Sequence, residues 1–98
     1  MARRVYFSRG ARADLLALYR YIAKHGSPLA ALGFVERIES FCMGLRDFPE
    51  RGARRDDLRP GLRIVGFERR VSIAFHINSR GVFIDRIFYG GRNLDALL

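Results

Sequence analysis

The fold is decided by residues 11–45, whose sequence is ARADLLALYRYIAKHGSPLAALGFVERIESFCMGL. The first half carries apolar residues at the three- and four-residue spacings of one helix face, namely Ala11, Leu15, Leu18 and Ile22. Ser8 is placed to cap this helix, and Asp14 puts negative charge early in it. Gly26 suits the left-handed position after the last turn. The sequence therefore predicts a first helix that ends at His25-Gly26.

A second helix follows after a short turn. Ser27 and Pro28 place a capping residue directly before a proline at the first helical position. The apolar stripe of this helix consists of Ala31, Phe34, Val35, Ile38, Phe41, Cys42 and Leu45. Two amphipathic helices joined by a tight turn form an antiparallel hairpin. We expect both stripes to pack on a common core.

Strand patterns lie on both sides of this hairpin. Residues 4–7 form a short strand candidate before it, and residues 49–61, rich in proline, glycine and charge, form a predicted loop after it. Residues 71–77 alternate apolar and polar side chains, which predicts a half-buried strand facing the helices. Its partners are residues 62–67, where Gly66 marks a weak centre or a bulge, and residues 82–89. The last segment is apolar on both faces, which indicates a central strand.

The predicted order, β-α-α-β-β-β, belongs to the α+β class. A helical hairpin packs on one face of a small, mainly antiparallel sheet. The length of 98 residues suits a single domain, so we assign residues 1–98 to one domain.

Charge is the most informative property of the composition. Eighteen Lys and Arg, of which Lys24 is the only lysine, stand against ten Asp and Glu, so the net charge is +8. Such a surplus in a small domain suggests an acidic or polyanionic partner, although codon bias also enriches arginine. Because the chain has neither an apolar run of membrane-spanning length nor a signal-peptide pattern, we expect a soluble cytoplasmic protein with no membrane partner.

Most chemical sites are not supported by the residues present. His25 and His76 are far apart in sequence and no Cys/His cluster exists, so we expect no metal and no other cofactor. Cys42 lies on a core stripe, where burial makes a thiol unreactive. Asp56 and Asp57 are adjacent and project in different directions, which argues against catalysis by paired carboxylates.

A basic and aromatic cluster is expected at one end of the sheet. Arginine offers a fixed fork for anions, tyrosine a stacking face, and glycine a close approach to another backbone. The candidate target-binding surface comprises Arg63, Arg86, Tyr89, Gly90, Gly91 and Arg92. The structural alternative is that Arg86 pairs internally with Asp85 or Asp95 and that Tyr89 belongs to the core.

The helices carry more apolar surface than one sheet face can cover. Leu32 and Met43 lie about 100–120° from the core stripe of the second helix, and Leu16 is similarly off-axis on the first. Tyr21 lies off the opposite edge of the first helix. An apolar patch along a two-helix groove is typical of a protein-binding site, so Leu16, Leu32 and Met43 are candidate partner contacts. Ordinary helix–helix packing is the alternative.

Three stretches of the chain resemble one protein family. Ser8-x-x-Ala11-x-x-Asp14-Leu15-x-x-Leu18-x-x-Tyr21-Ile22 resembles the opening helix of ParE-type toxins of bacterial toxin–antitoxin modules. Pro49 and Gly52, followed by Gly61-Leu62-Arg63, are similar to the midsection of these toxins. Ile84-Asp85-Arg86-Ile87-Phe88-Tyr89-Gly90-Gly91-Arg92 resembles their terminal strand and tail. Each motif is degenerate alone, but together they cover nearly the whole chain and resemble the RelE/ParE superfamily.

The resemblance to ParE implies a toxin that arrests growth by poisoning DNA gyrase, as an inhibitor and not as a catalyst. It also implies a cognate, ParD-like antitoxin with an acidic, amphipathic tail. Nucleic acid would then be reached only through such partners.

The RelE branch of the superfamily implies a different function, that of a ribosome-dependent mRNA endonuclease. Arg63 and Arg86 would then hold the scissile phosphate, and Tyr89 or His76 would move protons. Arginine cannot exchange protons near neutral pH, and Lys24 lies far from the cluster. Gyrase poisoning is therefore the favoured function and the nuclease the alternative, ahead of a binding protein without toxicity.

Overall fold

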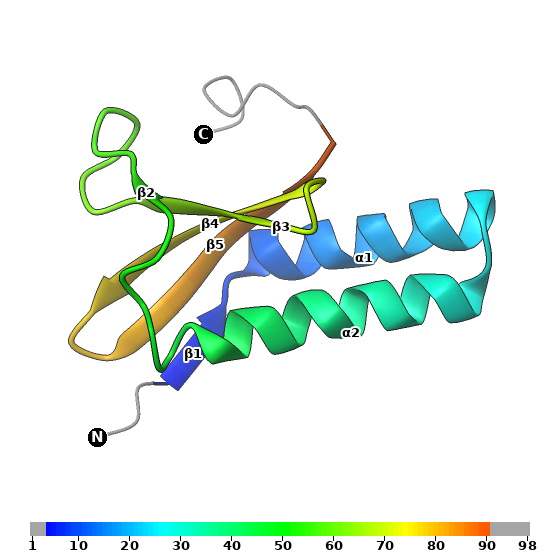
Figure 1. Ribbon diagram of the computed structural model, residues 1–98, viewed down its shortest axis with the longest axis horizontal. Coiled ribbons are helices and arrows are strands. Elements are labelled where there is room, and N and C mark those ends of the chain that lie inside the picture. Colours follow the sequence, from blue (N-terminus) through cyan, green and yellow to red (C-terminus); the bar gives the residue numbers. More distant parts are fainter. Residues whose placement is uncertain (1–3, 91–98) are drawn as a thin grey trace.

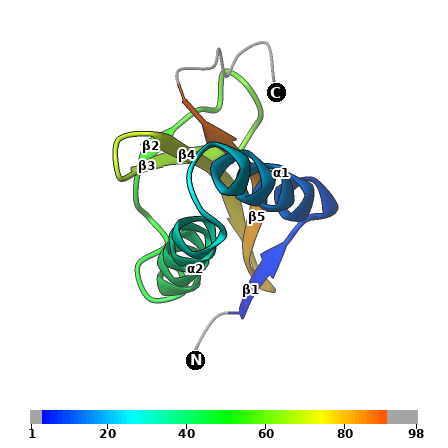
Figure 2. The ribbon, with the colours of Figure 1, turned by 90° about the vertical axis from the view of Figure 1, so that its right-hand side faces the viewer.

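Two helices and five strands make up residues 4–90, the part of the chain that the computed structural model describes. The elements are β1 Arg4–Phe7, α1 Arg9–His25, α2 Pro28–Gly44, β2 Ala53–Arg54, β3 Arg63–Phe67, β4 Val71–Asn78 and β5 Gly81–Tyr89. Both helices lie on one face of the sheet (Figures 1 and 2). The predicted α+β architecture is confirmed, and the two-residue strand β2 is an addition within the predicted loop.

The sheet has the strand order β1-β5-β4-β3-β2. β1 runs parallel to β5, while all other neighbouring strands are antiparallel. Gly81 allows β1 to lie close to the start of β5, because a Cβ atom at this position would stand 2.2 Å from the carbonyl oxygen of Arg4. The short β1 and β2 are therefore the two edges of the sheet.

The helix boundaries follow from local sequence. The side chains of Ser8 and Ser27 accept hydrogen bonds from the backbone N–H groups of Ala11 and Ala30, so both serines are N-caps as predicted. Gly26 does follow the last turn of α1, but its φ of −138° is not left-handed, so that part of the prediction is wrong. The expected role of Asp14 at the helix start is also wrong, because α1 begins at Arg9 and its first turn holds no acidic residue.

The main core lies between the helices and the sheet. On β4, Val71, Ile73 and Phe75 are buried and Ile77 is partly buried, all on the helix-facing side. They pack in one cluster with the predicted helical partners Leu15, Leu18, Ile22, Phe34, Ile38 and Leu45. The predicted strand register and core are confirmed.

A smaller core lies on the opposite face of the sheet. Leu62, Ala74 and Phe88 are buried there, and Leu58 and Ile64 pack against them. Because β5 has a strand on each side and buried residues on both faces, the prediction of a central last strand is confirmed.

A bulge in β5 reverses the alternation of its side chains. Phe75 lies opposite Ile84, but the preceding Ala74 lies opposite Arg86, so Asp85 is the extra residue. Gly66 keeps a regular register with Ser72, and the suggestion of a bulge at Gly66 is therefore wrong.

Candidate functional site

Arg86 is held at the edge of the sheet by α1. Its Nε and Nη2 atoms donate hydrogen bonds of 2.8 and 3.1 Å to the carboxylate of Asp14. The hydrogen bonds from Arg86 to Asp14 raise the pKa of the guanidinium above its ordinary value. The alternative of an internal partner for Arg86 is therefore correct, but among the described residues the partner is Asp14 and not Asp85, and Asp95 lies outside the described residues.

Asp14 also provides a hydrogen-bond acceptor for the part of β5 that β1 does not reach. β1 ends at Phe7 opposite Ile84, so within residues 4–90 no strand pairs with this edge of β5 beyond that point. Ser8 continues the pairing through its N–H to the carbonyl of Ile84, and Asp14 accepts the N–H of Ile87 at 2.9 Å. The start of α1 thus satisfies backbone groups that an exposed strand edge would leave free.

Tyr89 and Gly90 line a cleft of about 410 Å³ at the end of β5. The other walls come from α1, through Asp14, Ala17, Leu18 and Tyr21, and from Ile87 and Arg70 of the sheet end. The Tyr89 ring is half-buried against Tyr21 and Phe34, with ring centroids 6.1 and 6.0 Å away. Tyr89 is therefore both part of the core and accessible from this cleft.

Arg63 does not join this group. It pairs with Phe75, which lies opposite Ile84, whereas Tyr89 pairs with Val71, which lies opposite Phe67. The two rows are four residues apart along β3, or about 13 Å at the rise of a β-strand. The prediction of one cluster containing Arg63 is therefore wrong, and Gly91 and Arg92 lie outside the described residues.

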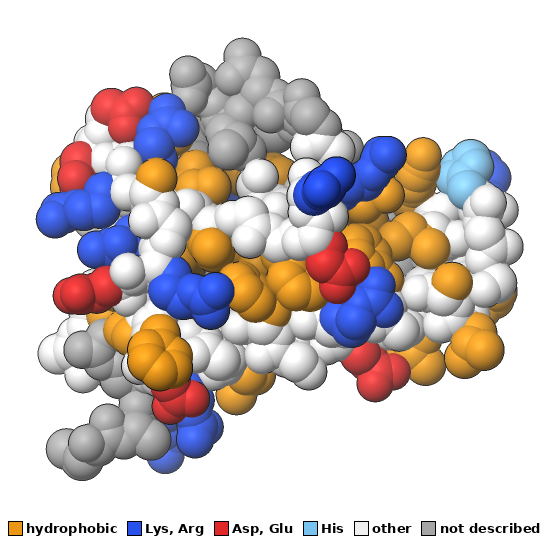
Figure 3. All heavy atoms as spheres, viewed as in Figure 1, with side chains coloured by type: hydrophobic (Ala, Val, Ile, Leu, Met, Phe, Trp, Pro, Cys, Tyr) orange, Lys and Arg blue, Asp and Glu red, His pale blue; other side chains and the backbone are white. Residues whose placement is uncertain are grey.

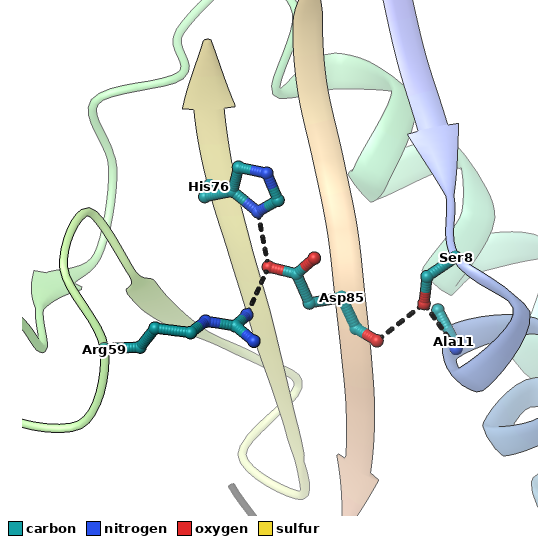
Figure 4. A network of polar contacts seen from close by, with 5 residues as sticks. All are labelled: Ser8, Ala11, Arg59, His76 and Asp85. Atoms are coloured by element: carbon teal, nitrogen blue, oxygen red, sulfur yellow. Dashed lines mark hydrogen bonds and ion pairs between the residues drawn. The ribbon is translucent and has the colours of Figure 1, made fainter.

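A second polar network lies on the opposite face of the sheet (Figure 4). The carboxylate of Asp85 lies 2.6 Å from Nδ1 of His76 and accepts a 3.0 Å hydrogen bond from Arg59. The backbone carbonyl of Asp85 accepts the Ser8 hydroxyl at 2.7 Å. The network ties the loop before β3 to the sheet and to the start of α1. His76 stacks on Phe83, whereas Tyr89 faces the helices, so His76 and Tyr89 lie on opposite faces.

Arg59 and Asp85 were not predicted to lie beside His76. The available signal was the adjacent charged pair Asp85-Arg86, which interrupts an apolar strand at the point where the apolar alternation changes phase. Such a break indicates a bulge that redirects one side chain.

The off-stripe apolar residues of the helices are exposed, as expected. Leu16, Leu32 and Met43 have exposed fractions of 48, 48 and 42%. Leu29, at 80%, was missed although it lies on the same side of α2. On the face shown in Figure 3, hydrophobic side chains reach the surface over the free end of the hairpin. Packing between the two helices therefore does not bury these side chains.

Other candidate chemistries find little support in residues 4–90. Burial raises the pKa of the Cys42 thiol to about 12, with the charge of Glu39 adding to the effect. Asp56 and Asp57 are exposed and pair with Arg54 and Arg55. The pKa of Asp56 is lowered first by the hydrogen bond from the backbone N–H of Gly61 and then by Arg54, and the pKa of Asp57 is lowered by Arg55. Acidic and basic side chains lie side by side on this part of the surface in Figure 3. Within this range there is no group of three potential metal ligands, and neither helix is long and apolar enough to cross a membrane.

Comparisons with known proteins agree with this architecture. Residues 5–94 match the family model of the ParE toxin of the type II toxin–antitoxin system parDE. Toxin ParE3 of Caulobacter vibrioides is 35% identical over 95 residues, which cover 97% of this chain and 94% of that protein.

Two solved structures extend the likeness to three dimensions. A chain of the chromosomal ParDE system from P. aeruginosa superposes with a TM-score of 0.80 at 28% identity, covering 92% of this chain and 98% of that one. A chain of the RelBE2 toxin–antitoxin complex from Mycobacterium tuberculosis superposes with a TM-score of 0.64 at 20% identity, covering 91% of this chain and 99% of that one, which is a likeness in fold. By its sequence match along nearly its whole length, this chain belongs to the ParE toxin family of type II toxin–antitoxin systems.

Proposed function

We propose that this toxin arrests growth in the cytoplasm by binding and inhibiting DNA gyrase, and that a cognate antitoxin neutralises it. Membership of the ParE family is the observation that carries the proposal. The dispersal of the candidate catalytic groups supports it further. Arg63 and Tyr89 lie in rows about 13 Å apart, Arg86 is bound to Asp14, and His76 lies on the other sheet face. A nuclease needs its phosphate-binding and proton-transfer groups around one scissile bond.

The proposed target surface is the end of β5. Tyr89 and Gly90 line an open cleft there, beside the cation of Arg70. Gly91 and Arg92 continue the chain from this point, and Arg86 supports the surface from the edge of the sheet through Asp14. Arg63 would contact the target separately, from the other end of β3.

Purified gyrase provides the direct test. We expect the toxin to block supercoiling of relaxed plasmid or to trap gyrase-cleaved DNA, and to leave RNA intact with or without ribosomes. Site-specific cleavage of mRNA in a translating extract, abolished by Arg63→Ala or Tyr89→Phe, would overturn the proposal in favour of a RelE-like nuclease.

A charge-removal variant tests the target surface. Arg92→Ala should reduce growth arrest with little change in stability, while Arg80→Ala, in the exposed turn between β4 and β5, serves as the matched control. Full toxicity of the Arg92 variant at equal expression would place the target surface elsewhere.

The proposed antitoxin covers the hairpin. An amphipathic helix lying along Leu16, Leu32 and Met43 would bury their exposed apolar surface in the manner of helix-in-groove recognition. The acidic part of the antitoxin would steer association with the +8 toxin. Leu32→Asp and Met43→Asp should each weaken antitoxin binding at both low and high salt, and unchanged affinity in both variants would show that the groove is not used.

A further inference from the structure

The outer side of α2 carries a regular pattern of apolar and acidic side chains. At 100° per residue, Leu29, Leu32, Glu36, Glu39 and Met43 fall within an arc of about 80°. All five side chains are exposed. We call this set the α2 stripe, in which the two glutamates lie between apolar residues at both ends.

The two glutamates of the α2 stripe are unusual in this arginine-rich protein. Of the nine acidic residues within 4–90, six form ion pairs with an arginine, namely Asp14, Asp47, Asp56, Asp57, Glu68 and Asp85. Glu36, Glu39 and Glu50 have no ion-pair partner in this range. Arg37, which is adjacent to Glu36 in sequence, instead binds Glu68 at 2.9 Å on the sheet side of α2.

We propose that the α2 stripe binds an antitoxin helix that places Lys or Arg opposite Glu36 and Glu39, between apolar residues that cover Leu32 and Met43. This inference rests on the proposed function, which already places the antitoxin on the hairpin. A partner that covers the apolar residues also removes water from the glutamates between them. A carboxylate that loses water without gaining a cation is strongly destabilised.

The geometry favours a helix as the binding element. Leu32 and Met43 are eleven residues apart, or about 16.5 Å along the helix axis, which is three turns. A second helix lying alongside has the same rise per residue, so its apolar residues can match both anchors and its middle turn then faces Glu36 and Glu39. The long-range attraction of the antitoxin's acidic residues must therefore act on other, arginine-rich surfaces.

Charge also argues against a second copy of this chain as the occupant. A two-fold pairing that places Leu32 against Met43 of the other copy has its centre midway between residues 37 and 38. The same symmetry places Glu36 directly opposite Glu39 of the other copy, because these two residues share that midpoint. Like charges would then face each other across an interface that excludes water, which is unfavourable.

The test compares single charge reversals in the affinity of purified toxin for its cognate antitoxin. We expect Glu36→Lys and Glu39→Lys each to weaken binding by about fivefold to tenfold at low salt, and less at high salt. Glu50→Lys is the control, because Glu50 also has no ion-pair partner within residues 4–90 but lies outside the α2 stripe; this variant should change affinity by less than about twofold. Glu36→Gln and Glu39→Gln should change affinity in the same direction but by less.

Each other outcome overturns the inference. If Glu50→Lys weakens binding as much as Glu36→Lys and Glu39→Lys, the affinity depends only on the net charge of the toxin. If Glu36→Lys and Glu39→Lys leave binding unchanged or make it tighter, no antitoxin cation lies opposite these glutamates. All variants should still arrest growth when produced without antitoxin. If wild-type toxin fails to arrest growth or to bind the antitoxin, the proposed function itself fails, which is a distinguishable result.

Discussion

Asp14 shows how one side chain can join elements that are far apart in sequence. Its carboxylate accepts two hydrogen bonds from Arg86 and one from the backbone of Ile87. It thereby ties α1 to the part of β5 that has no strand neighbour on this side within residues 4–90. The local sequence suggested only that the charge of Asp14 interacts favourably with the dipole of its own helix. The contact with Arg86 could not be predicted from local patterns, because the two residues are 72 positions apart.

Removal of this carboxylate should therefore be costly. Asp14→Ala removes the hydrogen-bond acceptor of a half-buried guanidinium and of a strand N–H, and we expect it to lower the free energy of unfolding by about 2–3 kcal/mol. Urea denaturation measures this, with Asp47→Ala as the control because Asp47 forms only a 4.0 Å surface pair with Arg46. Equal effects of the two substitutions would contradict the assigned role of Asp14.

The Cys42 thiol gives a second prediction at this scale. An unfolded cysteine ionises near a pKa of about 8.5, whereas burial raises the pKa in the folded protein to about 12. Between these values the unfolded state has lost the thiol proton and the native state retains it. Folding stability should therefore fall as pH rises, by about 1.4 kcal/mol per pH unit above pH 8.5, and this contribution should be absent from Cys42→Ala. Iodoacetamide should label Cys42 only when the protein unfolds, and rapid labelling of the folded protein would contradict the burial of this thiol.

At the scale of the elements, the helices were predictable and the sheet details were not. Serine caps, the proline of the second helix and apolar stripes are signals within a few residues of one another. The bulge at Asp85 depends instead on how β5 aligns with β4. Val82 and Ile84 face the helices before the bulge, whereas Ile87 and Tyr89 face them after it. The apolar residues at both even and odd positions of β5 therefore have two causes: the bulge shifts the alternation by one residue, and both faces of the strand are buried.

The turn between β3 and β4 offers a test of backbone strain. Glu68 and Arg69 have φ values of +48° and +65°, in the left-handed region that non-glycine residues rarely adopt. Arg69→Gly should relieve this strain and stabilise the protein by about 0.5–1 kcal/mol. Arg70→Gly is the control, because Arg70 has no positive φ and glycine there adds only freedom to the unfolded chain. A lower melting temperature for Arg69→Gly would contradict this account.

At the scale of the whole molecule, the exposure of side chains on the helices was predictable from the sequence, but the grouping of side chains across the sheet was not. Helical geometry places Leu16, Leu32 and Met43 off the core stripes without any tertiary information, and all three are exposed. Arg63 and Tyr89 could lie together only if the start of β3 and the end of β5 were at the same end of the sheet. Because β3 and β5 run in the same direction on either side of β4, these positions lie at opposite ends of the sheet.

Charge acts at this scale as well, and it affects the rate of assembly more than its final strength. A net charge of +8 sets up a field that attracts an acidic antitoxin from a distance, and salt screens it over about 8–10 Å at physiological ionic strength. The association rate constant should therefore fall by about tenfold or more between 0.02 and 0.5 M salt, while the dissociation rate, governed by the apolar contacts together with the short-range ion pairs of the α2 stripe, changes much less. Stopped-flow mixing measures both rates.

A variant with lower charge separates this field from local contacts. Arg69→Gln with Arg80→Gln removes two exposed charges in turns at the two ends of β4, away from the α2 stripe, and reduces the net charge to +6. We expect slower association and a shallower salt dependence, with dissociation unchanged, because no antitoxin contact is assigned to these turns. A salt-independent association rate for the wild-type toxin would show that its charge surplus serves a surface other than the one that meets the antitoxin.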